Sequence, residues 1–141
     1  MRPLDSSILE YLKTQRIGVL ALRMPDGTPH AATVHFAYDE LSSIFIFQTS
    51  PTYRKVEAVK NGETTASFVV GVDEGYMKTL QLDGMAQLVD TETIKEAYLN
   101  KFPEKRDKHP DNVFITFTAS WWRFTDWTGP DGKKITSSDL D

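Results

Sequence analysis

The segment from Met77 to Val89 constrains the fold more than any other part of this chain. It reads MKTLQLDGMAQLV, and Leu80 and Leu82 alternate with polar side chains. Such alternation is typical of a β-strand with one buried and one exposed face. Gly84 interrupts the pattern, and a glycine inside a strand favours a bulge or bend. Strands of this kind are needed where a sheet closes into a barrel.

Other short apolar segments follow one another along the chain with tight turns between them. Asp26-Gly27 is a pair that favours a hairpin, and Asn61-Gly62 is a good helix stop. The pattern predicts strands over residues 17–23, 29–38, 44–48, 65–72, 77–89, 113–118 and 121–127, and helices over residues 8–14, 52–60 and 91–102. About seven strands with two to three short helices predict a mainly β protein built as a small antiparallel barrel.

Length and composition limit the classes of protein to which the chain can belong. Its 141 residues suit a single domain spanning 1–141, and 40% hydrophobic with 26% charged residues is ordinary for a folded protein. The absence of cysteine excludes disulfides, thiolate zinc sites and cysteine nucleophiles. The three histidines, His30, His35 and His109, show no metal-ligand spacing, so no metal site is predicted.

The N-terminal sequence MRPLDSSILEYLKTQ carries charged residues where a secretory signal needs an apolar core. No later segment reaches the length of a membrane span, so the sequence predicts a cytoplasmic protein without a membrane partner. The net charge of −4 gives no general attraction to nucleic acid. Any anion must therefore be bound by local geometry.

The stretch from Ser43 to Gly62 has the form of an anion site. An apolar strand runs into the turn Thr49-Ser50-Pro51, and adjacent Arg54 and Lys55 follow near the start of a short helix. Hydroxyl groups, free backbone N–H groups and two cationic side chains can converge where such a strand ends. This order of elements suits a phosphate, and the chain contains no glycine-rich nucleotide loop to hold one elsewhere. A solvated helix face is the alternative interpretation.

The segments DGTPHAATVHFAYDE, IFIFQTSPTYRKVEAV and KTLQLDGMAQLV occur in succession between residues 17 and 89. This half of the chain resembles the FMN-binding split barrel of the pyridoxamine 5′-phosphate oxidase superfamily. The resemblance implies an antiparallel split β-barrel that holds FMN at the interface of a homodimer. It also implies that Thr49, Ser50, Arg54 and Lys55 bind the FMN phosphate.

The same resemblance assigns further residues to the cofactor. The second strand is expected to run beside the isoalloxazine ring, which places Thr33, Val34 and His35 near it. His35 stands where family members often have lysine and could donate to the N1/O2 edge of the flavin; the alternative is a strand histidine satisfied by a neighbour. The family commonly has glutamine where this chain has Thr79, with Gln81 two residues later on the same strand face. Either side chain could reach a cofactor from the neighbouring subunit; the alternative is that this strand is simply barrel wall.

The segment SWWRFTDW contains all three tryptophans of the chain. Clustered indoles are favoured at interfaces and at the walls of aromatic cofactor sites. We therefore expect dimer core here, or a place beside the flavin for Trp122 and Trp127. The chain ends GPDGKKITSSDLD and lacks the arginine-containing terminal motif of the true oxidases. Pyridoxamine phosphate is accordingly not the expected substrate.

The leading hypothesis is an FMN-dependent oxidoreductase that works as a homodimer on a small molecule. The cofactor would perform the redox chemistry, so no catalytic side chain is assigned. A non-catalytic module that carries or stores FMN, or binds haem, is the second hypothesis, and a deazaflavin could replace FMN. In the third, the barrel binds no cofactor. The charged segment 103–112 is expected to be a solvated loop.

Overall fold

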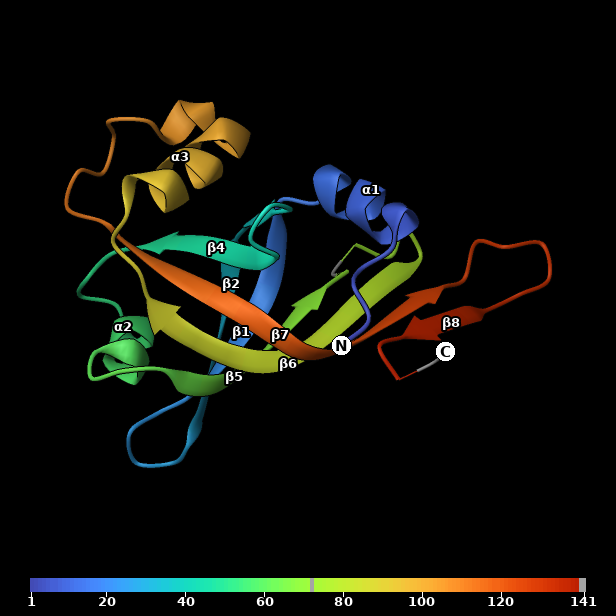
Figure 1. Ribbon diagram of the computed structural model, residues 1–141, viewed down its shortest axis with the longest axis horizontal. Helices are drawn as coiled ribbons and strands as arrows, with labels where there is room; N and C mark the ends of the chain where they lie inside the picture. The colour runs from blue at the N-terminus through green and yellow to red at the C-terminus, as the bar shows by residue number, and fades with distance from the viewer. Residues whose placement is uncertain (72, 140–141) are drawn as a thin grey trace.

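The computed structural model describes residues 1–71 and 73–139, and it is built mainly from antiparallel strands (Figure 1). Three α-helices and one 3₁₀ helix connect eight strands in this described part. The elements in chain order are α1 (Ser6–Thr14), β1 (Ile17–Arg23), β2 (Pro29–His35), β3 (Ala37–Asp39), β4 (Ile44–Thr49), α2 (Arg54–Val59), β5 (Thr64–Val70), β6 (Lys78–Leu88), α3 (Glu92–Lys101), η1 (Pro103–Lys105), β7 (Val113–Asp126) and β8 (Lys134–Ser137).

The strands form one sheet in the order β2-β1-β5-β6-β7-β4-β3, with β8 added beside β7. Although β2 and β3 are consecutive in sequence, they lie at opposite ends of this order. The sheet must therefore curl until its two ends meet, and the chain passes between them at Phe36, whose side chain is fully buried. Within the described residues, no ladder joins β2 to β3 or β4. This arrangement confirms the antiparallel split barrel.

The irregularity expected at Gly84 of β6 is present, and its extra residue is Ser120 in the partner strand β7. The register between β6 and β7 shifts between Asp83 and Gly84. A side chain at Gly84 would collide with the backbone of Thr118, so only glycine permits the close approach of the two strands. The bulge increases the local twist and so helps the sheet to curl.

The strands differ from those predicted in three places. The predicted strand over 29–38 is divided at Phe36, whose N–H donates to the carbonyl of Arg16 at 3.0 Å. The predicted strands over 113–118 and 121–127 are one strand, β7, because Ala119 stays paired with Gly84 and Ser120 is a single bulged residue, so the strand continues without a turn. Strand β8 was not predicted: a turn around Gly132, with φ +90°, folds the tail back onto β7.

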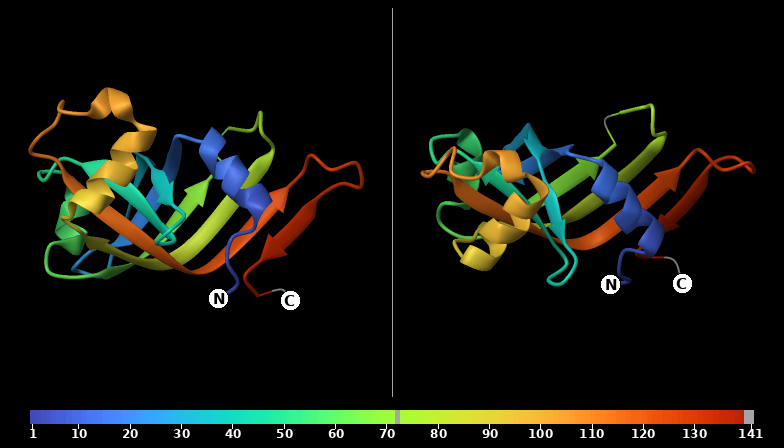
Figure 2. Two further views of the ribbon diagram at one scale, coloured as in Figure 1. Left: turned by 45° about the horizontal axis from the view of Figure 1, so that its top comes forward. Right: turned by 90° about the horizontal axis from the view of Figure 1, so that it is seen from above.

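The core occupies the concave side of the curled sheet. Leu20, Phe68, Leu82 and Trp122 come from one row of the ladder across β1, β5, β6 and β7, and all are buried. Helix α1 covers one end of this concave side, and α3 lies over β3 and β4 (Figures 1 and 2). The opposite face of the central strands carries no helix in these views.

The helices are too short or too polar to serve as membrane spans. In the part of the chain that the structure describes, none has the length and apolar character needed to cross a bilayer.

Candidate functional site

A pocket lies at the seam where the two ends of the sheet meet without hydrogen bonding. Its volume is about 470 Å³, and we call it the seam pocket. Strands β2 and β4 form two of its walls, and the turn after β4, helix α2 and the segment after α3 supply the others. The lining residues are Thr33, Val34, His35, Gln48, Thr49, Ser50, Tyr53, Lys55, Lys105, His109 and Asn112.

Thr49 is the last residue of β4, and it contributes an unsatisfied hydroxyl group. Its side chain is 3% exposed, and Oγ1 has no hydrogen-bond partner among the described residues. A buried hydroxyl without a partner destabilises the folded protein by about 1–3 kcal/mol. Such a group indicates a site that is completed when a ligand supplies an acceptor or a donor.

Lys55 lies in the first turn of α2 and is 9% exposed. No hydrogen bond or ion pair is present for its ammonium group in residues 1–71 and 73–139; the group lies 5.1 Å from the centroid of the Tyr53 ring. Burial lowers the pKa of Lys55. A desolvated cation without a carboxylate partner is unfavourable by itself, and an anion would stabilise it.

The far side of the seam pocket carries a second group of basic side chains. His35 ends β2, and its ring meets Phe102 edge-on with centroids 5.5 Å apart. Partial burial is the largest cause that lowers the pKa of His35, and the charges of Lys105 and Arg16 lower it further. Lys105 donates to the Tyr98 hydroxyl at 3.0 Å, and burial lowers its pKa too.

The pocket is therefore an electropositive cavity. Two lysines and two histidines line it, and no aspartate or glutamate is found among its described lining residues. The chain as a whole has a net charge of −4, so this concentration of basic groups is local. The composition of this cavity suits an anionic ligand that offers several oxygen acceptors.

The structure brings six of the eleven predicted cofactor residues together in this pocket. They are Thr33, Val34, His35, Thr49, Ser50 and Lys55. Arg54 is adjacent in sequence but does not line the pocket. It is exposed at the start of α2, and its charge is one of the smaller causes that lower the pKa of Asp26 in the β1–β2 turn.

Thr79 and Gln81 lie elsewhere in the chain, but on the same face of the sheet as the β2 residues. The register aligns Thr33, Val19, Val69 and Gln81 in one row across β2, β1, β5 and β6. Directly paired residues share a face, and so do residues two apart on one strand. Thr33, His35, Thr79 and Gln81 therefore all project from the outer face, opposite the core.

The three tryptophans have three different environments. Trp122 is 0% exposed, and its indole N–H donates to the carbonyl of Arg2 at 2.8 Å. Trp122 lines a cavity of about 360 Å³ that is separate from the seam pocket. Trp121 donates from its indole to Asp139 at 2.6 Å. Trp127 is 42% exposed and lines a second pocket of about 340 Å³ together with Thr79.

The family model for pyridoxamine 5′-phosphate oxidase matches residues 4–126, which is most of the chain. The chain belongs to this family. No curated protein matches it. The seam pocket and the outer-face residues all lie within the matched range, whereas β8 lies outside it.

Solved structures show the same fold. A pyridoxamine 5′-phosphate oxidase-related, FMN-binding protein from Nostoc punctiforme has a TM-score of 0.72 at 13% identity, over 100% of this chain and 98% of that one. General stress protein 26 from Bacillus anthracis has a TM-score of 0.67 at 18% identity, over 92% and 94%. A heme-binding protein from Mycobacterium smegmatis has a TM-score of 0.70 at 14% identity; the match covers 98% of this chain but 59% of that protein.

In this member of the pyridoxamine 5′-phosphate oxidase family, sequence reasoning missed five residues that line the seam pocket. They are Gln48, Tyr53, Lys105, His109 and Asn112. Three of them come from the segment 103–112, which was expected to be only a solvated loop. Most of this segment is exposed, as expected, and His109 lines the pocket from an exposed position. The segment carries three Lys or Arg and three Asp or Glu residues, so its composition gave no signal of a basic site.

Proposed function

We propose that this protein binds FMN in the seam pocket, with the phosphate held by the side chains of Thr49, Ser50 and Lys55. The observation that carries the proposal is the pairing of Thr49 and Lys55: a buried hydroxyl and a buried ammonium group line one cavity, and both lack a polar partner among the described residues. A phosphate supplies several acceptor oxygens and two negative charges, and it would satisfy both groups.

The remaining walls suit the rest of FMN. Val34 and the Tyr53 ring are apolar surfaces, while His35, Gln48 and Asn112 offer hydrogen-bonding groups to a polar ribityl chain or ring edge. When bound, FMN supplies hydride and electron transfer, and the protein orients it and adjusts its potential. The basic groups around His35 would stabilise negative charge on a nearby ligand, because the attraction between opposite charges is strong in a partly desolvated cavity.

We further propose that the working unit is a homodimer joined through the outer face of the sheet. Val69 is 37% exposed there, and Val19 and Ala21 are half-buried although no helix covers them. A second copy would cover this apolar surface and would place its own Thr79 and Trp127 near the first copy's cofactor. Light scattering should report a particle of twice 16.0 kDa; a monomer at micromolar concentration would exclude this assembly.

The binding proposal is tested by comparing FMN with riboflavin, which has the same ring and ribityl chain but no phosphate. Each is titrated into cofactor-free protein, and the quenching of flavin fluorescence is measured. We expect FMN to bind at least about thirtyfold more tightly, which corresponds to about 2 kcal/mol from charge-assisted hydrogen bonds. Equal affinities would refute the phosphate assignment, and a colourless protein that takes up neither compound would refute flavin binding.

The redox role is tested separately on the FMN-loaded protein. Anaerobic addition of NADH or NADPH should bleach the flavin absorbance, and a suitable electron acceptor should restore it. Reduction and reoxidation over many cycles support an oxidoreductase. If dithionite reduces the bound flavin but NADH and NADPH do not, the result would support an electron carrier or an FMN store and not an oxidoreductase.

Haem binding is the second candidate, and one observation favours it. His35 and His109 line the same pocket, and the lowered pKa of His35 favours the neutral imidazole that ligates iron. A structural neighbour from Mycobacterium smegmatis is a heme-binding protein. Titration with hemin should then give a saturable Soret band that is lost in the variant His35→Ala with His109→Ala. A protein that binds FMN and gives no such band excludes this candidate.

A further inference from the structure

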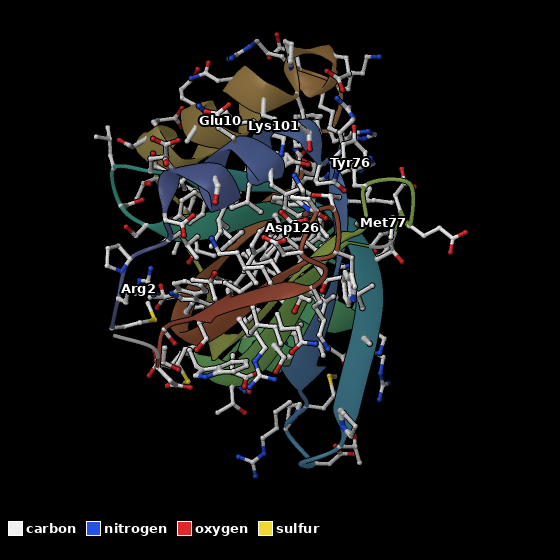
Figure 3. All side chains as sticks on the ribbon, turned by 90° about the vertical axis from the view of Figure 1, so that its right-hand side faces the viewer. Arg2, Glu10, Tyr76, Met77, Lys101 and Asp126 are labelled. Atoms are coloured by element: carbon white, nitrogen blue, oxygen red, sulfur yellow. The ribbon has the colours of Figure 1, made fainter. Side chains whose placement is uncertain are left out.

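Lys101 lies beside a cavity separate from the seam pocket. It is near the end of α3, at the place where α3 comes close to α1 (Figure 3). The cavity between these helices has a volume of about 300 Å³. Apolar side chains form most of its wall, and polar groups stand at its rim. Its lining residues are Leu9, Leu12, Lys13, Ala37, Tyr38, Glu40, Ala97, Asn100 and Lys101.

The amine of Lys101 is held in a fixed position. Nζ donates to the carbonyl of Gln15 at 2.5 Å and to the carbonyl of Leu12 at 3.3 Å, at the C-terminal end of α1. It also lies 4.1 Å from the centroid of the Phe36 ring. No carboxylate forms an ion pair with it in the described part of the chain. The position is thus set by two carbonyls and an aromatic ring, none of which is a charged partner.

The charged and titratable groups around this amine come from several elements. Arg16 follows α1 and repels the ammonium form, and Lys13 and Glu40 lie at the cavity rim 3.9 Å from each other. Tyr38 projects from β3, and burial raises the pKa of its hydroxyl. Burial is the largest cause that lowers the pKa of Lys101, and with Arg16 it brings the value to about 8. A lysine at ordinary exposure has a pKa of about 10.4.

We propose that Lys101 is a covalent site for small aliphatic aldehydes, which enter the cavity between α1 and α3 and form an imine with its amine. In this reaction the nitrogen lone pair attacks the carbonyl carbon, the oxygen takes up two protons, and water leaves as the C=N bond forms. No oxidant or reductant is required. The site is independent of the proposed FMN function, because it uses none of the seam-pocket residues.

The composition of the cavity sets the class of ligand. Leu9, Leu12 and Ala97 offer apolar surface to an alkyl chain, so an aldehyde with a short aliphatic tail fits better than a charged sugar phosphate. Lys13 is the matched comparison, since it lines the same cavity. Its side chain is exposed and pairs with Glu10 at 3.2 Å, and this contact raises its pKa. Its amine therefore stays protonated and unreactive under conditions in which Lys101 reacts.

The test uses the full-length protein and butanal, with cyanoborohydride present to reduce the imine to a stable butyl amine. Peptide mass spectrometry follows the labelling of Lys101, Lys13 and Lys60 at pH 8 as butanal is varied. We expect Lys101 to react at least about tenfold faster than exposed Lys60, because far more of its amine is unprotonated at this pH. We also expect the Lys101 rate to saturate with butanal while the other two rates rise linearly.

Two variants separate binding from simple reactivity. Ala97→Leu narrows the cavity and keeps the amine, so half-saturation should need at least about fivefold more butanal. Lys101→Arg keeps the positive charge and removes the nucleophile, so saturable labelling should disappear while the circular dichroism spectrum is unchanged. Labelling of Lys101 that is linear in butanal, or no faster than that of Lys60, overturns the proposal.

Discussion

Lys55 and Lys101 are both removed from solvent and have lowered pKa values, but the fold treats them differently. Lys101 donates to two backbone carbonyls and lies over the Phe36 ring. Lys55 faces a cavity, with no hydrogen bond or ion pair to any other described residue. The first lysine connects α3 to α1. The second holds a charge that nothing in the described chain compensates.

This difference separates a lysine whose hydrogen bonds are completed within the chain from one that has no polar partner there. A half-buried cation that completes its hydrogen bonds within the chain stabilises the fold, and its removal takes a donor from the carbonyls that it contacts. A buried cation that lacks partners destabilises the fold until an anion binds. Replacing the two lysines by the same apolar residue should therefore have opposite effects on the folded protein without ligand.

The largest effect is expected for FMN affinity in Lys55→Met. The variant loses a charge-assisted contact to the phosphate, which is worth about 2–3 kcal/mol, so the FMN dissociation constant should rise about 30- to 150-fold. Riboflavin affinity should be unchanged, because riboflavin has no phosphate. Arg54→Ala is the matched control: Arg54 does not line the seam pocket, so its loss should weaken FMN less than tenfold. Equal losses in both variants would show that Lys55 has no special part in binding.

The next largest effect is expected for the stability of Lys101→Met. The Gln15 carbonyl loses its Lys101 donor, while the Leu12 carbonyl keeps the N–H of Gln15, and the free energy of unfolding should fall by about 2 kcal/mol. Urea denaturation of the protein without ligand measures this value. Lys55→Met is the comparison, and it should leave stability unchanged or raise it by up to about 1 kcal/mol, since an uncompensated cation is removed. If the free energy of unfolding fell by a similar amount in both variants, the proposed difference between the two lysines would be wrong.

The pH dependence of stability gives a third test of Lys101. Its pKa in the folded protein is about 8 and is below the value of 10.5 for an unperturbed lysine, so the unfolded chain binds more protons between these values. Stability contributed by this group therefore rises with pH in that window. The difference in unfolding free energy between wild type and Lys101→Met should grow by about 1–2 kcal/mol from pH 7.5 to 9.5. A constant difference would contradict the lowered pKa.

Local pattern was enough to predict one side of the seam pocket but not the other. A strand, a turn and a short helix place Thr49, Ser50 and Lys55 within a few residues of one another, and local geometry decides where they lie. Lys105 and His109 reach the same pocket from a segment more than fifty residues later in the chain. Their position depends on how η1 turns after α3, and no periodicity in the sequence encodes that turn.

The same limit explains the errors in the fold. Alternation of apolar and polar residues predicted the strands and the bulge at Gly84, because both follow from local sterics. It did not show that β7 continues past Ala119, since continuity there depends on accommodating Ser120 as a bulge opposite β6. Nor could three clustered indoles show that Trp122 packs into the core of its own chain. Whether a side chain is buried depends on the residues that pack around it, and the sequence alone does not place those residues.

The smallest expected effect concerns the orphan hydroxyl of Thr49. Valine has nearly the same shape as threonine and lacks the hydroxyl, so Thr49→Val removes an unsatisfied buried oxygen from the protein without ligand. Its unfolding free energy should rise by about 1 kcal/mol. FMN affinity should fall about 12-fold, which corresponds to one hydrogen bond to the charged phosphate of about 1.5 kcal/mol.

The two measurements on Thr49→Val must move in opposite directions if this hydroxyl belongs to a phosphate site. Thr116→Val is a suitable control, because Thr116 is also buried in a neighbouring strand but does not line the seam pocket. That variant should leave FMN affinity unchanged. If Thr49→Val were less stable than wild type and bound FMN equally well, the hydroxyl would have a structural role, and Lys55 alone would remain to define the anion site.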